Sequence, residues 1–73
     1  MTTYVVTRID PEPIEKQNVF AEDFTQAAER SRLRRPGYLL SVAIYKLKSS
    51  AIVRFYVCPD GSLQELGRYE AKP

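Results

Sequence analysis

The side chains able to do chemistry in this chain of 73 residues are arginines, carboxylates and tyrosines, because it contains one cysteine and no histidine. Cys58 has no imidazole to activate its thiol, so it fits a small buried strand residue better than a nucleophile. Zinc and other transition metals would lack their usual ligands. Asp10, Glu12 and Glu15 lie in or beside a proline loop, where nothing would desolvate a carboxylate for acid–base catalysis. We therefore expect no enzymatic activity, no catalytic residue, no metal and no cofactor.

A run of arginines is the strongest local signal in the chain. Residues 30–35 contain four of them, at Arg30, Arg32, Arg34 and Arg35. At the end of a helix, one or two of these cations would complement the negative end of the helix dipole, but four exceed that need. The arginine fork also makes bidentate contacts with phosphates and carboxylates. The run therefore predicts either a charged helix end or an electropositive lip that meets an anionic partner, and both interpretations stay open.

Charge is distributed unevenly along the chain. Residues 1–29 carry two basic and six acidic side chains, a net charge of −4, whereas residues 30–73 carry nine basic and three acidic ones, a net charge of +6. The stretch from Arg30 to Arg54 contains seven basic residues and no acidic one. This asymmetry favours an anionic partner, either nucleic acid or an acidic protein surface. The acidic first third and the overall charge of only +2 weigh against free DNA as the main ligand.

The strands and the helix that must position these side chains can be predicted from residue types and from the turn residues between them. Runs rich in β-branched and aromatic residues, separated by proline, glycine and serine turns, are typical of strands. Asp23 has the character of a helix N-cap, with Gln26 at the capping-box spacing, and Pro36-Gly37 is expected to end the helix. Five strands are expected, over residues 3–9, 14–21, 38–48, 51–58 and 63–69, the last with a bulge at Gly67.

Two further predictions concern packing. Phe24, Ala27, Ala28 and Ser31 share one helix face, which predicts a helix lying close on a sheet. If Ser49-Ser50 forms a two-residue hairpin loop, directly opposed residues have numbers that sum to 99. The face beneath the helix then carries Val42, Ile44 and Lys46 opposite Val57, Phe55 and Val53. The opposite face makes neighbours of three exposed residues: Tyr45, Arg54 and Tyr56.

The sequence as a whole predicts an α+β domain over residues 1–73. We expect an antiparallel four- or five-stranded sheet with one helix packed on one face, in the order ββαβββ. No apolar run approaches the ~20 residues of a membrane span, and residues 1–5 do not resemble a signal peptide. We therefore expect a soluble, cytoplasmic protein that does not bind membranes. Its second sheet face must be solvated or covered by a partner.

One resemblance to a known family rests on three features of the chain. They are the tyrosine–valine first strand, the helix start Asp23-Phe24-Thr25-Gln26-Ala27-Ala28, and the hairpin that ends at Asp60-Gly61. Together they resemble the small phage-encoded anti-CRISPR proteins of the type I-F inhibitor group, over most of the chain in order and spacing. The resemblance implies a non-enzymatic inhibitor that docks on backbone subunits of the CRISPR surveillance complex, where target DNA would run. No functional residue is carried over from that group.

The leading functional prediction is a phage or mobile-element protein that inhibits a nucleic-acid-handling complex in the host cytoplasm. Two alternatives stay open: direct nucleic-acid binding, as in a phage regulator of host transcription, and a structural role through dimerisation of the open face. The protein would be a monomer or a homodimer. Partner contacts are predicted, on one continuous rim or two separate sites, for Arg30, Arg32, Arg34, Arg35, Tyr45, Arg54 and Tyr56.

Overall fold

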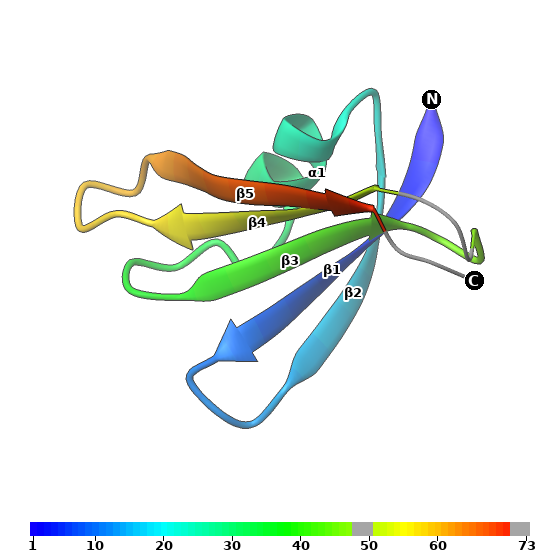
Figure 1. Ribbon diagram of the computed structural model, residues 1–73. Helices are drawn as coiled ribbons and strands as arrows, with labels where there is room; N and C mark the ends of the chain where they lie inside the picture. Colours follow the sequence, from blue (N-terminus) through cyan, green and yellow to red (C-terminus); the bar gives the residue numbers. More distant parts are fainter. Residues whose placement is uncertain (48–50, 71–73) are drawn as a thin grey trace.

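The computed structural model describes residues 1–47 and 51–70 and shows one helix packed on a five-stranded antiparallel sheet (Figure 1). The predicted α+β class and ββαβββ order are confirmed, with five strands rather than four. The elements are β1 (Thr2–Asp10), β2 (Glu15–Ala21), α1 (Phe24–Arg30), β3 (Leu39–Ile44), β4 (Ala51–Val57) and β5 (Leu63–Glu70).

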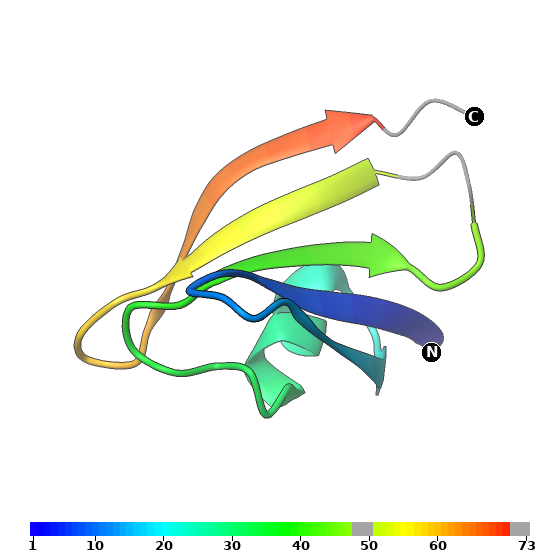
Figure 2. The same ribbon diagram turned by 90° about the horizontal axis from the view of Figure 1, so that it is seen from below.

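The strands lie in the order β2-β1-β3-β4-β5, and each neighbouring pair is antiparallel. After β2 the chain leaves the sheet, forms α1 on one face, and returns as β3 on the far side of β1. Figure 2 shows α1 beneath the sheet, and no other helix or strand of the described chain covers the opposite face. The sheet therefore has one face in the core and one open face, as antiparallel sheets commonly do.

Helix α1 begins where the sequence predicts. The Asp23 carboxylate accepts a hydrogen bond from the backbone N–H of Gln26 at 2.7 Å, and the Gln26 side chain accepts one from the backbone N–H of Glu22 at 2.8 Å. The first of these bonds satisfies an amide group that a helix start leaves without a partner inside the helix. The N-cap prediction is confirmed, although the return bond of the capping box reaches one residue before the cap.

The predicted end of the helix at Pro36-Gly37 is wrong, because α1 ends at Arg30 and Ser31 is already extended. The physical reason lies in the helical repeat. A longer helix would continue the stripe that faces the sheet through Arg34 and Arg35 and would leave Leu33 on the outside. Burying two unpaired guanidinium groups is costly. Instead, the extended Ser31 and the turn that follows it place Leu33 in the core at 6% exposure.

The helix stripe packs as predicted. Ala27 and Ala28 are fully buried against the sheet, and the half-buried Phe24 ring meets the Tyr4 ring edge-on, with centroids 5.0 Å apart. The sheet side of this core contains the five predicted residues: Val42, Ile44, Val53, Phe55 and Val57. Small residues on α1 allow the helix backbone to approach the sheet, while the larger side chains come from β3 and β4.

The predicted register of the β3–β4 hairpin is wrong by four residues. Val42 pairs with Val53 rather than Val57, and β3 ends at Ile44 instead of reaching Lys48. Lys46, which was expected in the strand, adopts a left-handed conformation (φ 60°) in a turn, and the predicted Ser49-Ser50 loop lies outside the described residues. Because a slip of four is even, each residue of the two strands keeps its predicted face.

The second hairpin follows its turn chemistry. Gly61 has a φ of 89°, and the Asp60 carboxylate accepts hydrogen bonds from the Ser62 backbone and hydroxyl at 2.9 and 2.6 Å. Glycine adopts such a conformation without steric cost, which explains its place in this turn. The bulge predicted in β5 lies directly beside Gly67: that residue pairs with Arg54, Glu65 pairs with Phe55, and Leu66 between them is unpaired in the β4–β5 ladder.

Candidate functional site

The four arginines of residues 30–35 do not form one lip at a helix end, because only Arg30 belongs to α1. Its guanidinium group donates to the Phe20 carbonyl at 3.0 Å, so it lies against β2. Arg34 donates to the Gly61 carbonyl at 2.9 Å and lies against the β4–β5 turn. Arg32 and Arg35 line a pocket on the helix side of the sheet. The run thus splits into two arginines that bind the protein's own backbone and two that face a pocket.

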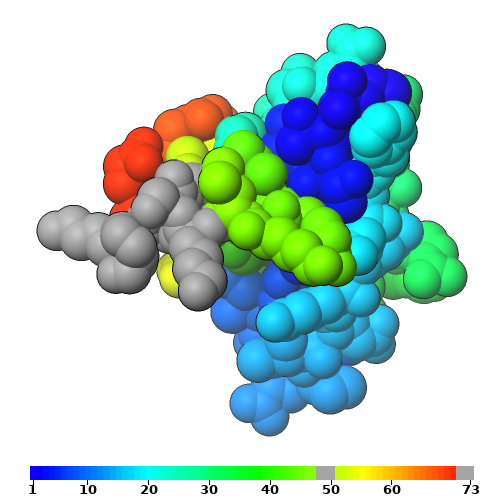
Figure 3. Space-filling model, turned by 90° about the vertical axis from the view of Figure 1, so that its right-hand side faces the viewer, coloured from blue at the N-terminus to red at the C-terminus, as the bar shows by residue number. Residues whose placement is uncertain are grey.

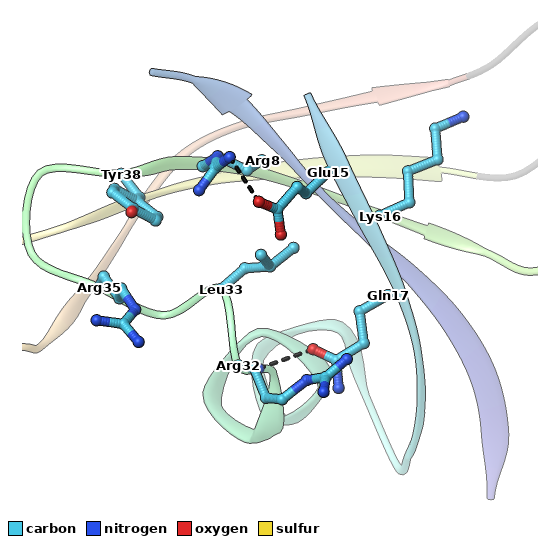
Figure 4. A pocket seen from close by; sticks show the side chains of 8 residues that line it. All are labelled: Arg8, Glu15, Lys16, Gln17, Arg32, Leu33, Arg35 and Tyr38. Atoms are coloured by element: carbon cyan, nitrogen blue, oxygen red, sulfur yellow. Dashed lines mark hydrogen bonds and ion pairs between the residues drawn. The ribbon is translucent and has the colours of Figure 1, made fainter. Parts of the chain in front are cut away.

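This pocket lies between the β1–β2 hairpin and the segment that follows α1 (Figure 4). Its volume is about 450 Å³, within the range of small-molecule sites. Figure 4 shows the Lys16 side chain extending away from the others, which leaves three arginines and one carboxylate as the charged groups around the space. We call it the arginine pocket, and its walls are formed by Arg8, Glu15, Lys16, Gln17, Arg32, Leu33, Arg35 and Tyr38.

Arg8 is the fixed part of the arginine pocket. It is only 8% exposed, and its Nε and Nη2 donate to the Pro13 carbonyl at 3.1 and 2.7 Å. Nη2 also donates to the Glu15 carboxylate at 2.9 Å, and the guanidinium carbon lies 4.9 Å from the centroid of the Tyr38 ring. Strand register places the pair together, because Arg8 is opposite Glu15 across β1 and β2. These contacts hold the guanidinium plane in one orientation.

The segment carrying Arg32 and Arg35 is held in place by its neighbours. The Arg32 backbone N–H donates to the Gln17 side chain at 2.7 Å, which ties the segment to β2. Leu33 is buried, and the Tyr38 N–H donates to the Arg35 carbonyl at 3.0 Å. The backbone around the pocket is therefore fixed, whereas the exposed Arg32 and Arg35 side chains remain free to move toward a ligand.

Charge in the arginine pocket is only partly balanced. The one ion pair there joins Arg8 to Glu15, whose side chain is 56% exposed. Arg32 and Arg35 make no ion pair with any residue in the described part of the chain. Two uncompensated arginines beside a fixed third one give an electropositive concavity, and such a surface attracts phosphate or carboxylate groups.

The predicted trio on the open face is not brought together. Because of the register, Arg54 is opposite Ser41 and Tyr56 is opposite Leu39, whereas Tyr45 follows the end of β3. The Tyr45 N–H donates to the Thr3 carbonyl at 2.9 Å, and Figure 3 shows the turn after β3 (light green) beside the start of the chain (dark blue). Arg54 and Tyr56 lie on the open face of β4, with Tyr45 some distance away along the sheet.

Sequence reasoning missed two groups of residues. On the open face, Arg54 stacks on Tyr69 at 5.0 Å, because the bulge at Leu66 changes which face the end of β5 presents. In the arginine pocket it missed Arg8 and Tyr38. The signal for Arg8 was present: it occupies the third inward-facing position of β1, after Tyr4 and Val6, where a cation is unexpected.

The remaining observations restrict other site types within the described residues. They contain no group of three or more histidine, cysteine or acidic residues that could hold a metal ion. No helix in residues 1–47 and 51–70 is long and apolar enough to cross a membrane. No family model, curated protein or solved structure matches the chain. The similarity to anti-CRISPR proteins therefore stays a prediction based on the residues quoted for it.

Proposed function

We propose that this protein is a non-catalytic binding protein that docks on a host nucleic-acid-handling complex and inhibits it, as anti-CRISPR proteins do. The observation that supports this best is the arginine pocket, where residues far apart in sequence place three guanidinium groups around one space. Arginine stays protonated in proteins, so it supplies charge and hydrogen-bond donors rather than a base. A cluster of this kind suits recognition of an anionic group better than proton transfer.

A protein complex suits the surface better than free nucleic acid does. The acidic side chains of residues 1–29 would repel a duplex laid across the whole molecule. The open face adds an arginine–tyrosine stack at Arg54 and Tyr69, with the exposed Phe20 ring elsewhere on the same face. Arginine and aromatic side chains are enriched at protein interfaces. In this proposal the protein acts in the host cytoplasm and binds the complex through the arginine pocket and the open face.

Direct nucleic-acid binding is the second candidate, and the unpaired Arg32 and Arg35 favour it. Salt dependence separates the two functions, because binding through phosphates weakens steeply with added salt. Binding through a mixed aromatic and charged interface should weaken less over the same range.

The experiment is inhibition of target-DNA binding by a purified type I-F surveillance complex. We expect DNA binding to fall as the protein is added, and the protein to co-elute with the complex. Arg35→Glu should weaken this association by about 2–5 kcal/mol if the arginine is buried against an acidic group. Arg68→Glu is the matched control, since it makes the same charge change on an exposed residue outside the arginine pocket.

Absence of both inhibition and co-elution, with folding verified by circular dichroism, would refute the proposed inhibitor. If the protein then bound DNA alone with a steep salt dependence, the second candidate would replace it.

A further inference from the structure

We infer that the arginine pocket binds the phosphate group of a nucleotide, held by Arg8, Arg32 and Arg35 with the Tyr38 hydroxyl as an additional donor. This inference rests on the proposed function, since it names the group that the same pocket would accept on a nucleic-acid-handling complex. The argument uses the orientation of Arg8, the size and charge of the pocket, and the unpaired donors around it.

Arg8 has the properties of a built site. Burial and three hydrogen bonds fix its guanidinium group before any ligand arrives. Its Nη1 atom makes no hydrogen bond within the described residues, yet no buried side-chain nitrogen or oxygen there lacks a partner. Nη1 must therefore reach solvent, and it is a donor available to a ligand. A fixed donor costs little entropy on binding, which is the advantage of preorganisation.

Size and charge favour a nucleotide over a lone carboxylate. A space of about 450 Å³ is far larger than one carboxylate requires, and it lies in the range that holds small molecules of nucleotide size. Glu15 balances one of the three arginines, which leaves about two positive charges. A terminal phosphate carries a charge of about −1.5 to −2 at neutral pH, with three strong acceptor oxygens. The charges therefore match.

The donors match the acceptors as well. Arg32 and Arg35 are exposed and able to turn their forks toward the pocket, where each could bind a phosphate through two parallel hydrogen bonds. Tyr38 lines the pocket, and its hydroxyl makes no hydrogen bond with any residue that the structure describes. Its ring already stacks on Arg8, so both groups are held together on one wall.

The test is an NMR titration of the purified protein that follows the backbone amides of residues 32–38 and the arginine Nε–Hε signals. The probes are inorganic phosphate, thymidine 5′-monophosphate, and a short oligothymidylate with and without a 5′-phosphate. We expect saturable shifts at Arg8 and in residues 32–38. Arg32→Gln and Arg35→Gln should each weaken binding about tenfold or more, as loss of a hydrogen bond to a charged group does.

Two controls separate a site from general charge attraction. Arg68→Gln and Lys46→Gln each remove one positive charge from an exposed side chain that does not line the arginine pocket. Both should change affinity less than about twofold if only non-specific electrostatics are affected. The oligothymidylate pair identifies the source: loss of binding without the 5′-phosphate indicates a strand end, whereas equal binding indicates an internal phosphodiester. If thymidine 5′-monophosphate binds as tightly as the 5′-phosphorylated oligothymidylate, the result indicates a free nucleotide.

Three results would overturn the inference: no saturable shift at Arg8 with any probe, equal weakening in Arg68→Gln and Arg35→Gln, or tighter binding of an acidic peptide than of every phosphate probe. These failures are distinct from failure of the proposed function. A protein that still inhibits the surveillance complex but binds no phosphate probe would refute the pocket inference alone. A protein that binds phosphate but does not associate with the complex would refute the proposed function alone.

Discussion

Arg8→Met should destabilise the protein far more than Glu15→Gln, because Arg8 is held mainly by a backbone carbonyl and a ring. The substitution keeps much of the aliphatic stem but removes two hydrogen bonds to the Pro13 carbonyl and the stack on Tyr38. Hydrogen bonds to a charged group contribute about 1.5–3 kcal/mol, and a partly desolvated cation–π contact contributes about 1 kcal/mol. Because both bonds share one acceptor, we expect a total loss of about 2–4 kcal/mol.

The ion pair itself should contribute little, since the Glu15 side chain is 56% exposed. Glu15→Gln keeps an oxygen that accepts from Arg8, so its cost should stay below about 1 kcal/mol. Urea unfolding monitored by circular dichroism gives both free energies. The slope of the unfolding free energy against urea concentration should be unchanged if the denatured state is unaffected. Equal losses in the two variants would show that the carboxylate holds Arg8, and our assignment of the anchor to Pro13 would be wrong.

Two further predictions concern the core and the second turn. Phe24→Ala should lower the free energy of unfolding by about 2–3 kcal/mol, less than the ~3–5 kcal/mol of a fully buried ring, because Phe24 is only half-buried. A loss below ~1 kcal/mol in urea unfolding would mean that the ring is not a core contact. Hydrogen bonds from the Ser62 hydroxyl and N–H lower the pKa of Asp60 below its usual 3.8, so its contribution to stability is present above pH 3.8 and is lost as pH falls through the folded-state pKa. An NMR pH titration should place the Asp60 midpoint below 3.8 and show it rising in Ser62→Ala; a midpoint at or above 3.8 would contradict this.

Features set by short-range chemistry could be predicted from the sequence. The strands appear as runs of β-branched and aromatic residues, and the helix start requires only Asp23 and Gln26. The turn at Asp60-Gly61 is likewise local. The buried faces of β3 and β4 follow from alternation, which an even register slip leaves unchanged. These features together are enough to predict the α+β class and the element order.

The helix end and the hairpin register depend on the rest of the fold. Nothing local ends α1 at Arg30, since the residues directly after it are acceptable helix formers and the next proline along the chain is Pro36. The helix ends there because Leu33 reaches the core from the turn that follows the extended Ser31. The register followed from a loop length assumed at Ser49-Ser50, and β3 ends four residues before Lys48. The position of Tyr69 depends in the same way on the rest of the fold. The bulge at Leu66 brings Tyr69 beside Arg54, which the sequence did not predict.

The arginine pocket is a consequence of the short helix. At 1.5 Å per residue the seven residues of α1 are about 10 Å long, whereas the nine residues of β1 span about 30 Å. Phe24 at the helix start contacts Tyr4, and Arg8 lies four residues further along the strand, about 13 Å away. The helix is therefore too short to cover this part of the sheet. Leu33 and Tyr38 cover it instead, and the arginines beside them line the remaining space. The early helix end thus leaves the space that the arginine pocket occupies.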